Sequence, residues 1–309
     1  MEKRSILTLS AMQTMAGRAI RDIKAGGRRE TRNILALCRS YARRPQQKEF
    51  WSVVKDSLLA DGNQYEALIH RAASSVREDS LKALAIGLSC TTFSSGRELL
   101  CREAASGQEN CWIQRLLPSA DMQEEVTAWT QKGVSVFLAD LSELKGCGAQ
   151  LAELPARNSR CIFIYIVQDA DQCPSCAARA PEAGNICILL SPQSVDAYGP
   201  RLREQKLFFG VIRGYEDIRD LQEEQALRRR WIDAGCLIGV YRSPRQSLPQ
   251  PREEELYREL VEIRCRGQLE LFLWDLERDT AVVQDVLMGR RKVPDGSHIH
   301  RGSGAYTDT

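Results

Sequence analysis

The chain has 309 residues, 43% of them hydrophobic and 27% charged, with a formal net charge of +2. These values are those of a soluble globular protein with one large domain or two ordinary ones. No run of 18 apolar residues occurs, which excludes a membrane-spanning helix. Ser10, Gln13 and Thr14 interrupt the apolar start of the chain, so we expect no signal peptide and a cytoplasmic location.

Basic residues are concentrated near the N-terminus. Nine Lys or Arg and two acidic residues lie between Arg18 and Arg44. A basic helix of this kind can bind nucleic acid or an anionic surface. No aromatic residue occurs between Arg18 and Arg39, however, which favours a solvated helix face. We therefore do not expect nucleic acid as a partner.

The pattern of residues 1–110 predicts a helical region. Apolar residues recur at helical spacing near Ile34 and again between Phe50 and Leu59. Leu81 to Cys90 is compatible with a buried helix or with a strand. Leu84 and Leu88 lie one turn apart, which favours the helix.

From residue 111 the pattern changes to short apolar runs separated by helical segments. The runs are Cys111–Leu117, Val134–Ala139, Cys161–Val167, Ile186–Leu190, Leu207–Ile212, Cys236–Tyr241 and Leu269–Trp274. Near-continuous apolar strands that alternate with helices indicate a parallel sheet buried on both faces. Six or seven such units favour a barrel or partial barrel. We assign residues 111–275 to it and residues 276–309 to a C-terminal extension and flexible tail.

Six stretches in this half of the chain carry a resemblance to a known family. They are residues 133–144 (GVSVFLADLSEL), 158–172, 185–199, 202–217, 231–244 and 269–300. Their order is similar to strands two to six, and the following segment, of the radical S-adenosylmethionine (radical SAM) superfamily. The resemblance covers about 190 residues. It implies an α/β fold with a partial (β/α)6 TIM barrel, preceded by the helical N-terminal region.

The chain departs from that family in its cofactor motifs. Members hold a [4Fe–4S] cluster with three cysteines, spaced C-x-x-x-C-x-x-C, on the loop after the first strand. The corresponding loop here is Pro118 to Asp121, which has no cysteine. Where the family has two glycines after the second strand, this chain has Asp140 and Leu141, followed by Ser142 and Glu143. The resemblance therefore implies a degenerate member that lacks its own cluster.

The chain has eleven cysteines, and Cys173 and Cys176 form its one C-x-x-C pair. Such a pair can ligate zinc or a cluster, or can act as a redox couple. No second close pair completes a zinc site, so the start of a helix with incidental thiols is favoured. Cys161, Cys187 and Cys236 lie in apolar runs, and we expect them to be reduced and buried.

Histidine contributes little to a candidate site. His298 and His300 would lie on one face of a strand and could bind a metal weakly, but a frayed tail is favoured. His70 lies in a predicted helix and is expected at the surface. We therefore do not expect acid–base catalysis by histidine.

The carboxyl ends of the predicted strands supply the remaining candidates, because in a parallel barrel they meet at one mouth. The residues that we expect at this mouth are Asp140, Glu143, Gln193, Arg213 and Arg242. Arg213 and Arg242 end neighbouring predicted strands. We expect their guanidinium groups to lie close together, with Asp140, Glu216 or an anionic ligand between them. The alternative is that these polar residues merely end strands in solvated loops.

The sequence thus favours a radical-SAM-like pseudoenzyme that acts as a binding, regulatory or partner protein. Its partner would be another protein or a small anionic ligand. The alternative is a related enzyme that uses S-adenosylmethionine with a non-standard or absent iron–sulfur cluster. We expect no resident cofactor, and S-adenosylmethionine is the ligand that the resemblance implies.

Overall fold

A computed structural model of the chain describes residues 2–26, 52, 63–144, 146–168, 183–243 and 250–290. For residues 2–10, 12, 26, 90, 250 and 251 only the backbone is described. The predictions for Cys173, Cys176, His298 and His300 lie outside these residues. Within them, no helix combines the length and the apolar character needed to cross a membrane.

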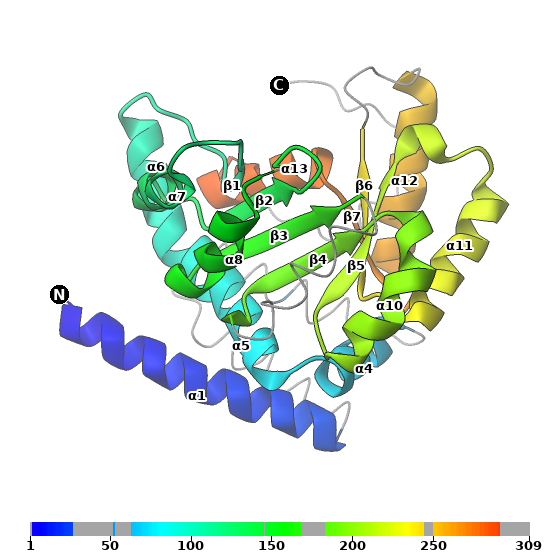
Figure 1. Cartoon of the computed structure of the whole chain (residues 1–309), viewed down its shortest axis with the longest axis horizontal. Helices are drawn as coiled ribbons and strands as arrows, with labels where there is room; N and C mark the ends of the chain where they lie inside the picture. The colour runs from blue at the N-terminus through cyan, green and yellow to red at the C-terminus, as the bar shows by residue number, and fades with distance from the viewer. Residues whose placement is uncertain are drawn as a thin grey trace.

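Seven parallel strands form a single sheet that curls into a half-barrel (Figure 1). The strands are β1 (Ile113–Arg115), β2 (Val136–Asp140), β3 (Ile162–Val167), β4 (Ile186–Leu190), β5 (Phe209–Gly214), β6 (Ile238–Arg242) and β7 (Phe272–Asp275). Their order in the sheet is their order in the chain. All seven apolar runs therefore form strands. The α/β partial barrel is confirmed, but it has seven strands where the resemblance implied six, because the seventh run pairs with β6 in the same sheet.

Helices that follow the strands cover the convex face of the sheet (Figure 1). They are α7 (Met122–Gln131), α8 (Gly148–Arg157), α10 (Val195–Glu204), α11 (Leu221–Ala234) and α12 (Gln250–Arg266). Two of them begin at an aspartate whose carboxylate accepts a backbone N–H, Asp121 from Glu124 at 2.9 Å and Asp220 from Gln222 at 3.0 Å. Gly235, with φ of +98°, ends α11. Alternate strand residues pack against these helices in the largest core.

The concave face carries a second set of apolar side chains, among them Ile166, Leu189, Ile212 and Val240. The predicted helical region lies on the N-terminal side of the strands and comprises α1 (Glu2–Gly26), α4 (Tyr65–Ser75), α5 (Glu78–Ile86), the π-helix η1 (Gly87–Gly96) and α6 (Arg97–Ala105). Residues 81–90 are helical, which confirms the favoured assignment. Leu84 and Leu100 of this region pack on Val136 and Ile162 at the start of β2 and β3.

Helix α13 (Arg278–Met288) lies between the two edge strands, which do not pair with each other. The indole N–H of Trp112 donates to the Thr280 carbonyl at 3.0 Å. The Gln284 amide accepts from the backbone N–H of Trp112 at 3.1 Å and donates to the Asn110 carbonyl at 2.9 Å. Trp112 also packs edge-on against Trp274 of β7, with ring centroids 6.4 Å apart. The first part of the predicted C-terminal extension is therefore packed against the half-barrel.

The three cysteines predicted to pack in the sheet region are buried, which confirms that prediction. Cys161, Cys187 and Cys236 are each at most 6% exposed. Burial raises the pKa of the Cys187 and Cys236 thiols to about 12, because a low dielectric disfavours the thiolate. These thiols therefore stay neutral over the ordinary pH range.

Candidate functional site: the polar rim of the half-barrel

Five polar side chains lie at the carboxyl end of the sheet, and we call them the rim cluster: Arg115, Asp140, Glu143, Gln168 and Arg242. Register places several of them on the concave side. Arg115 is opposite Leu138, and Asp140 is opposite Ile166, whose side chain belongs to the concave core. Arg242 lies two residues beyond Val240 of that core, and side chains two apart on a strand share a face.

Asp140 is the most connected member of the rim cluster and is only 4% exposed. One carboxylate oxygen accepts the backbone N–H of Ser142 at 3.1 Å and its hydroxyl at 2.6 Å. The other accepts the Gln168 amide at 3.3 Å and lies 3.7 Å from Arg242. The carboxylate is therefore held in place by several donors, so it does not depend on Arg242 alone.

Arg242 is the least constrained member. Its side chain is 35% exposed, and within the described residues its one ion pair is the long contact with Asp140. Glu277 lies close enough to interact with it electrostatically, and its carboxylate accepts the backbone N–H of Ser243 at 3.0 Å. Burial raises the pKa of Glu277, and the nearby Arg242 opposes this shift. Within the part of the chain that the structure describes, Asp140 is thus the one carboxylate at ion-pair distance from the Arg242 guanidinium.

The β1 side of the rim also has donors without acceptors. Arg115 forms an ion pair with Glu143, and this pair lies at the ends of β1 and β2. The Arg115 Nε and the hydroxyl of Ser119, in the loop after β1, are buried. Neither has a hydrogen-bond partner in the described part of the chain. Buried donors of this kind ordinarily meet water or a ligand.

Two residues predicted at the mouth lie elsewhere. Arg213 is opposite Tyr241 in the register, and Tyr241 belongs to the convex core. Its Nε lies 3.0 Å from the buried carboxylate of Glu224 on α11. The prediction that Arg213 and Arg242 share a carboxylate is therefore wrong, because adjacent register positions place them on opposite faces of the sheet. Gln193 is exposed in the short helix η3 (Pro192–Ser194), with no described hydrogen bond to the rim cluster.

Arg213 belongs instead to a buried charged network between the sheet and its outer helices. Glu224 accepts the hydroxyl of Tyr241 at 2.6 Å, and Tyr241 accepts from Nε of Arg228 at 2.8 Å. Arg228 also pairs with Glu259 of α12 at 3.1 Å. Glu224 and Arg228 are each 1% exposed. Each buried charge of this network thus lies against an opposite charge, although Arg213 Nε and the facing Glu224 oxygen are close without the geometry of a hydrogen bond. The network holds α11 and α12 on β5 and β6.

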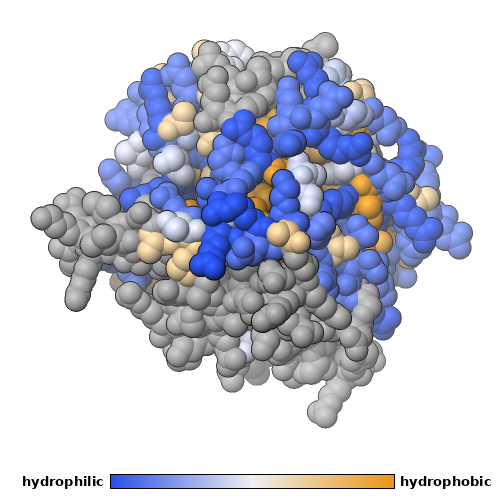
Figure 2. Space-filling view, turned by 90° about the horizontal axis from the view of Figure 1, so that it is seen from below, coloured by the Kyte–Doolittle hydropathy of each residue, from blue (hydrophilic) through white to orange (hydrophobic). Residues whose placement is uncertain are grey.

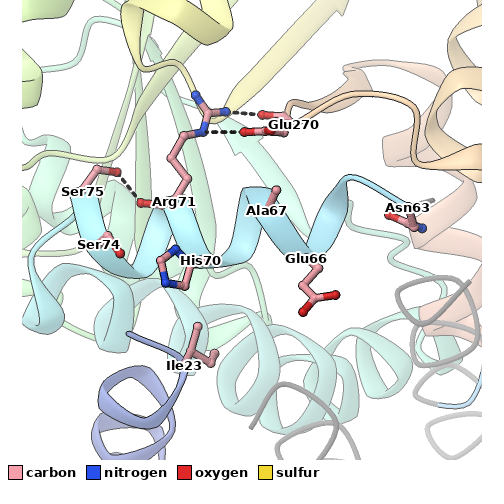
Figure 3. A pocket seen from close by; sticks show the side chains of 9 residues that line it. All are labelled: Ile23, Asn63, Glu66, Ala67, His70, Arg71, Ser74, Ser75 and Glu270. Atoms are coloured by element: carbon pink, nitrogen blue, oxygen red, sulfur yellow. Dashed lines mark hydrogen bonds and ion pairs between the residues drawn. The ribbon is translucent and has the colours of Figure 1, made fainter. Parts of the chain in front are cut away.

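An open hollow of about 750 Å³ lies at the opposite, N-terminal side of the sheet (Figure 3). His70 points from α4 toward Ile23 of α1, Ser74 and Glu66 lie on the same side of α4, and Arg71 points to the opposite side (Figure 3). Its guanidinium donates to the carbonyls of Ile232, at 2.8 Å, of Cys236, at 3.0 Å, and of Glu270.

Among the described residues of this wall, Arg71 is the one arginine or lysine, and its two terminal nitrogens donate to backbone carbonyls. Burial lowers its pKa. Seen from this side, the described surface is mostly hydrophilic with small apolar patches (Figure 2). Ligands of parallel α/β sheets bind at the carboxyl ends of the strands. We therefore take the rim rather than the hollow as the candidate site.

Sequence reasoning found three of the five rim residues and missed Arg115 and Gln168. It also did not single out Glu277. Arg115 lies inside the first apolar run, Cys111–Leu117, and Gln168 lies two residues beyond Ile166. Counting in steps of two from a residue known to face inward would have found both, and would have excluded Arg213.

The rim does not offer the ligands of the iron–sulfur cluster that members of the radical SAM superfamily hold. The loop from Leu116 to Asp121 joins β1 to α7 and contains no thiol. Among the described side chains, no three His, Cys, Asp or Glu are grouped so as to hold a metal ion. Comparison of the chain with family models, with curated proteins and with solved structures gave no match.

Proposed function

We propose that this protein is a relative of the radical SAM superfamily without the cluster loop, and that it binds a small molecule bearing a carboxylate or another anionic group. The binding site is the rim cluster, and the protein acts through binding, as a regulatory or partner protein. The observation that carries this proposal is the position of Arg242, one-third exposed and loosely paired at 3.7 Å, on the concave side of the strand ends.

The family relation is supported by the arrangement of the strands. Parallel strands in chain order, each separated from the next by a crossover segment, are the architecture that the resemblance implies. In this proposal, the six-residue connection from β1 to α7 corresponds to the cluster loop of the family. A protein with the short connection keeps the strand ends, where a ligand can bind, but lacks the thiolates that the cluster requires.

The ligand class follows from the donors at the rim. Arginine offers a planar set of N–H groups that suits a carboxylate or a phosphate. Arg242 has most of these groups available, and the buried Arg115 Nε and Ser119 hydroxyl supply two further donors. Asp140 lies 3.7 Å from Arg242 across the concave side of the sheet and leaves it loosely paired. The acceptor-rich group of the ligand would bind Arg242.

Isothermal titration calorimetry and thermal shift with S-adenosylmethionine, S-adenosylhomocysteine, L-methionine and inorganic phosphate test the proposal. A ligand at 100 times its dissociation constant stabilises the wild type by about 2.7 kcal/mol. We expect Arg242→Gln to weaken binding by roughly 10- to 150-fold, since a hydrogen bond to a charged group contributes about 1.5–3 kcal/mol. Arg229→Gln, an exposed position on α11, is the matched control and should bind normally.

Anaerobic reconstitution with iron and sulfide separates this proposal from the enzyme alternative. We expect no stable thiolate–iron absorbance after desalting, since the β1–α7 loop supplies no ligand. Near-stoichiometric iron and sulfide that survive desalting would favour a radical SAM-related enzyme with an unusual cluster. If no compound in the series binds the wild type, the rim is not a binding site for these anions.

A further inference from the structure

Glu216 lies over the end of β5, the strand that pairs with β6 and its last residue Arg242. A methyl group built on Gly214 would overlap the carboxylate of Glu216. Gly214 is opposite Arg242 in the register, so a side chain on Gly214 would point to the concave side. The Glu216 carboxylate therefore folds back over the last residue of β5, on the side where the Arg242 side chain lies.

The absence of a side chain at Gly214 is what leaves room for this carboxylate. The backbone of Gly214 has φ of −75° and ψ of 144°, a conformation that any residue adopts. Glycine is thus not required by the backbone at this position. Neighbouring strands lie about 4.8 Å apart, so the carboxylate lies roughly one strand spacing from the Cα of Arg242.

Glu216 is exposed and makes no hydrogen bond or ion pair with another described residue. Arg242 already faces Asp140 at 3.7 Å and interacts with Glu277. A third carboxylate beside one guanidinium leaves an excess of negative charge at this part of the rim. A ligand that carries only negative charge meets repulsion there, whereas a ligand that also carries a cation does not.

We infer that Glu216 is a specificity-determining residue of the rim, which favours ligands with a cationic group next to the carboxylate over plain carboxylates and phosphate. The carboxylate of the ligand pairs with Arg242, and the neighbouring cation pairs with Glu216. This inference rests on the proposed binding at the rim and names the class of ligand bound there.

The test compares L-methionine with 4-(methylthio)butanoate, which is the same molecule without its amino group. Dissociation constants come from chemical-shift titration of the wild type, Glu216→Gln, Gly214→Ala and the control Glu223→Gln. Glu223 is an exposed residue of the first turn of α11. We expect the wild type to prefer L-methionine by roughly two- to five-fold, the range that one exposed ion pair provides.

Glu216→Gln should abolish this preference, mainly through tighter binding of 4-(methylthio)butanoate, and Glu223→Gln should retain it. Gly214→Ala should have the same effect as Glu216→Gln, because the new methyl group displaces the flexible carboxylate. If Gly214→Ala does not fold, Glu216→Gln alone decides.

If the wild type binds both compounds and Glu216→Gln keeps the preference for L-methionine, the role of Glu216 is overturned. The binding at the rim is not. If the wild type binds neither compound, both the binding at the rim and the role of Glu216 are overturned, because no ligand is bound for Glu216 to discriminate. The two proposals thus fail in distinguishable ways.

Discussion

Arg242 at the end of β6 lies 3.7 Å from Asp140 at the end of β2, although three strands separate β2 from β6 in the sheet. The curl of the sheet brings these ends together across the concave side (Figure 1). Asp140 is anchored at its own strand by Ser142 and at β3 by Gln168. The contact therefore joins two distant parts of the rim while leaving Arg242 largely available.

The two partners of this contact should differ in their importance for stability. Asp140→Ala removes the acceptor of several donors, and we expect it to lower the free energy of unfolding by about 1–3 kcal/mol. Arg242→Gln should lower it by less than about 1 kcal/mol, because the side chain is 35% exposed and the pair is long. Urea denaturation of both variants checks the order. A larger effect of Arg242→Gln would mean that the ion pair, not the local hydrogen bonds, holds Asp140.

The buried network around Glu224 should be far more sensitive. Glu224→Ala leaves Arg213 and Arg228 without their shared carboxylate in a buried environment. We expect a loss of roughly 3–5 kcal/mol in the free energy of unfolding, typical of breaking a buried ion pair by removing one partner. Glu223→Ala, one residue earlier and exposed, should stay within about 0.5 kcal/mol of the wild type. Equal effects at the two positions would contradict the network as described.

Arg71 should act as a structural clamp rather than as a ligand-binding group. Arg71→Ala leaves the carbonyls of Ile232, Cys236 and Glu270 without this donor. We expect a loss of about 1–3 kcal/mol in the free energy of unfolding, with faster amide exchange in α4 and at the end of α11. His70→Ala, the exposed neighbour on α4, is the control and should change neither quantity. Unchanged exchange in Arg71→Ala would contradict the clamp.

The buried thiols should make the protein sensitive to alkali. Unfolded cysteine has a pKa of about 9, whereas Cys187 and Cys236 have a pKa of about 12 in the folded chain. Between these values the unfolded state has released protons that the folded state retains, so the free energy of unfolding falls as pH rises. Urea denaturation from about pH 8 to about pH 10 should show this fall.

A Cys187→Ala, Cys236→Ala double variant should show a shallower fall over the same range. In the native protein, a thiol reagent followed by peptide mapping should modify the exposed Cys265 well before Cys187 and Cys236. A pH dependence that is identical in the double variant would assign the alkaline sensitivity to other groups.

The sequence by itself determined the elements of this fold. Each of the seven apolar runs forms a strand, and Leu81 to Cys90 is helical. The burial of Cys161, Cys187 and Cys236 was likewise predictable. These features depend on hydrophobic periodicity and on short apolar runs, which act within a few residues of the chain.

Only the tertiary structure decided which strand-end side chains meet. A parallel sheet is buried on both faces, so its strands lack the alternation that would assign Arg213 to one face and Arg242 to the other. The contact between Arg242 and Asp140 depends on the curl of the whole sheet. The fold of Glu216 over Gly214 depends on how the chain leaves β5. Both result from the packing of many side chains at once, and no local stretch of the sequence encodes them.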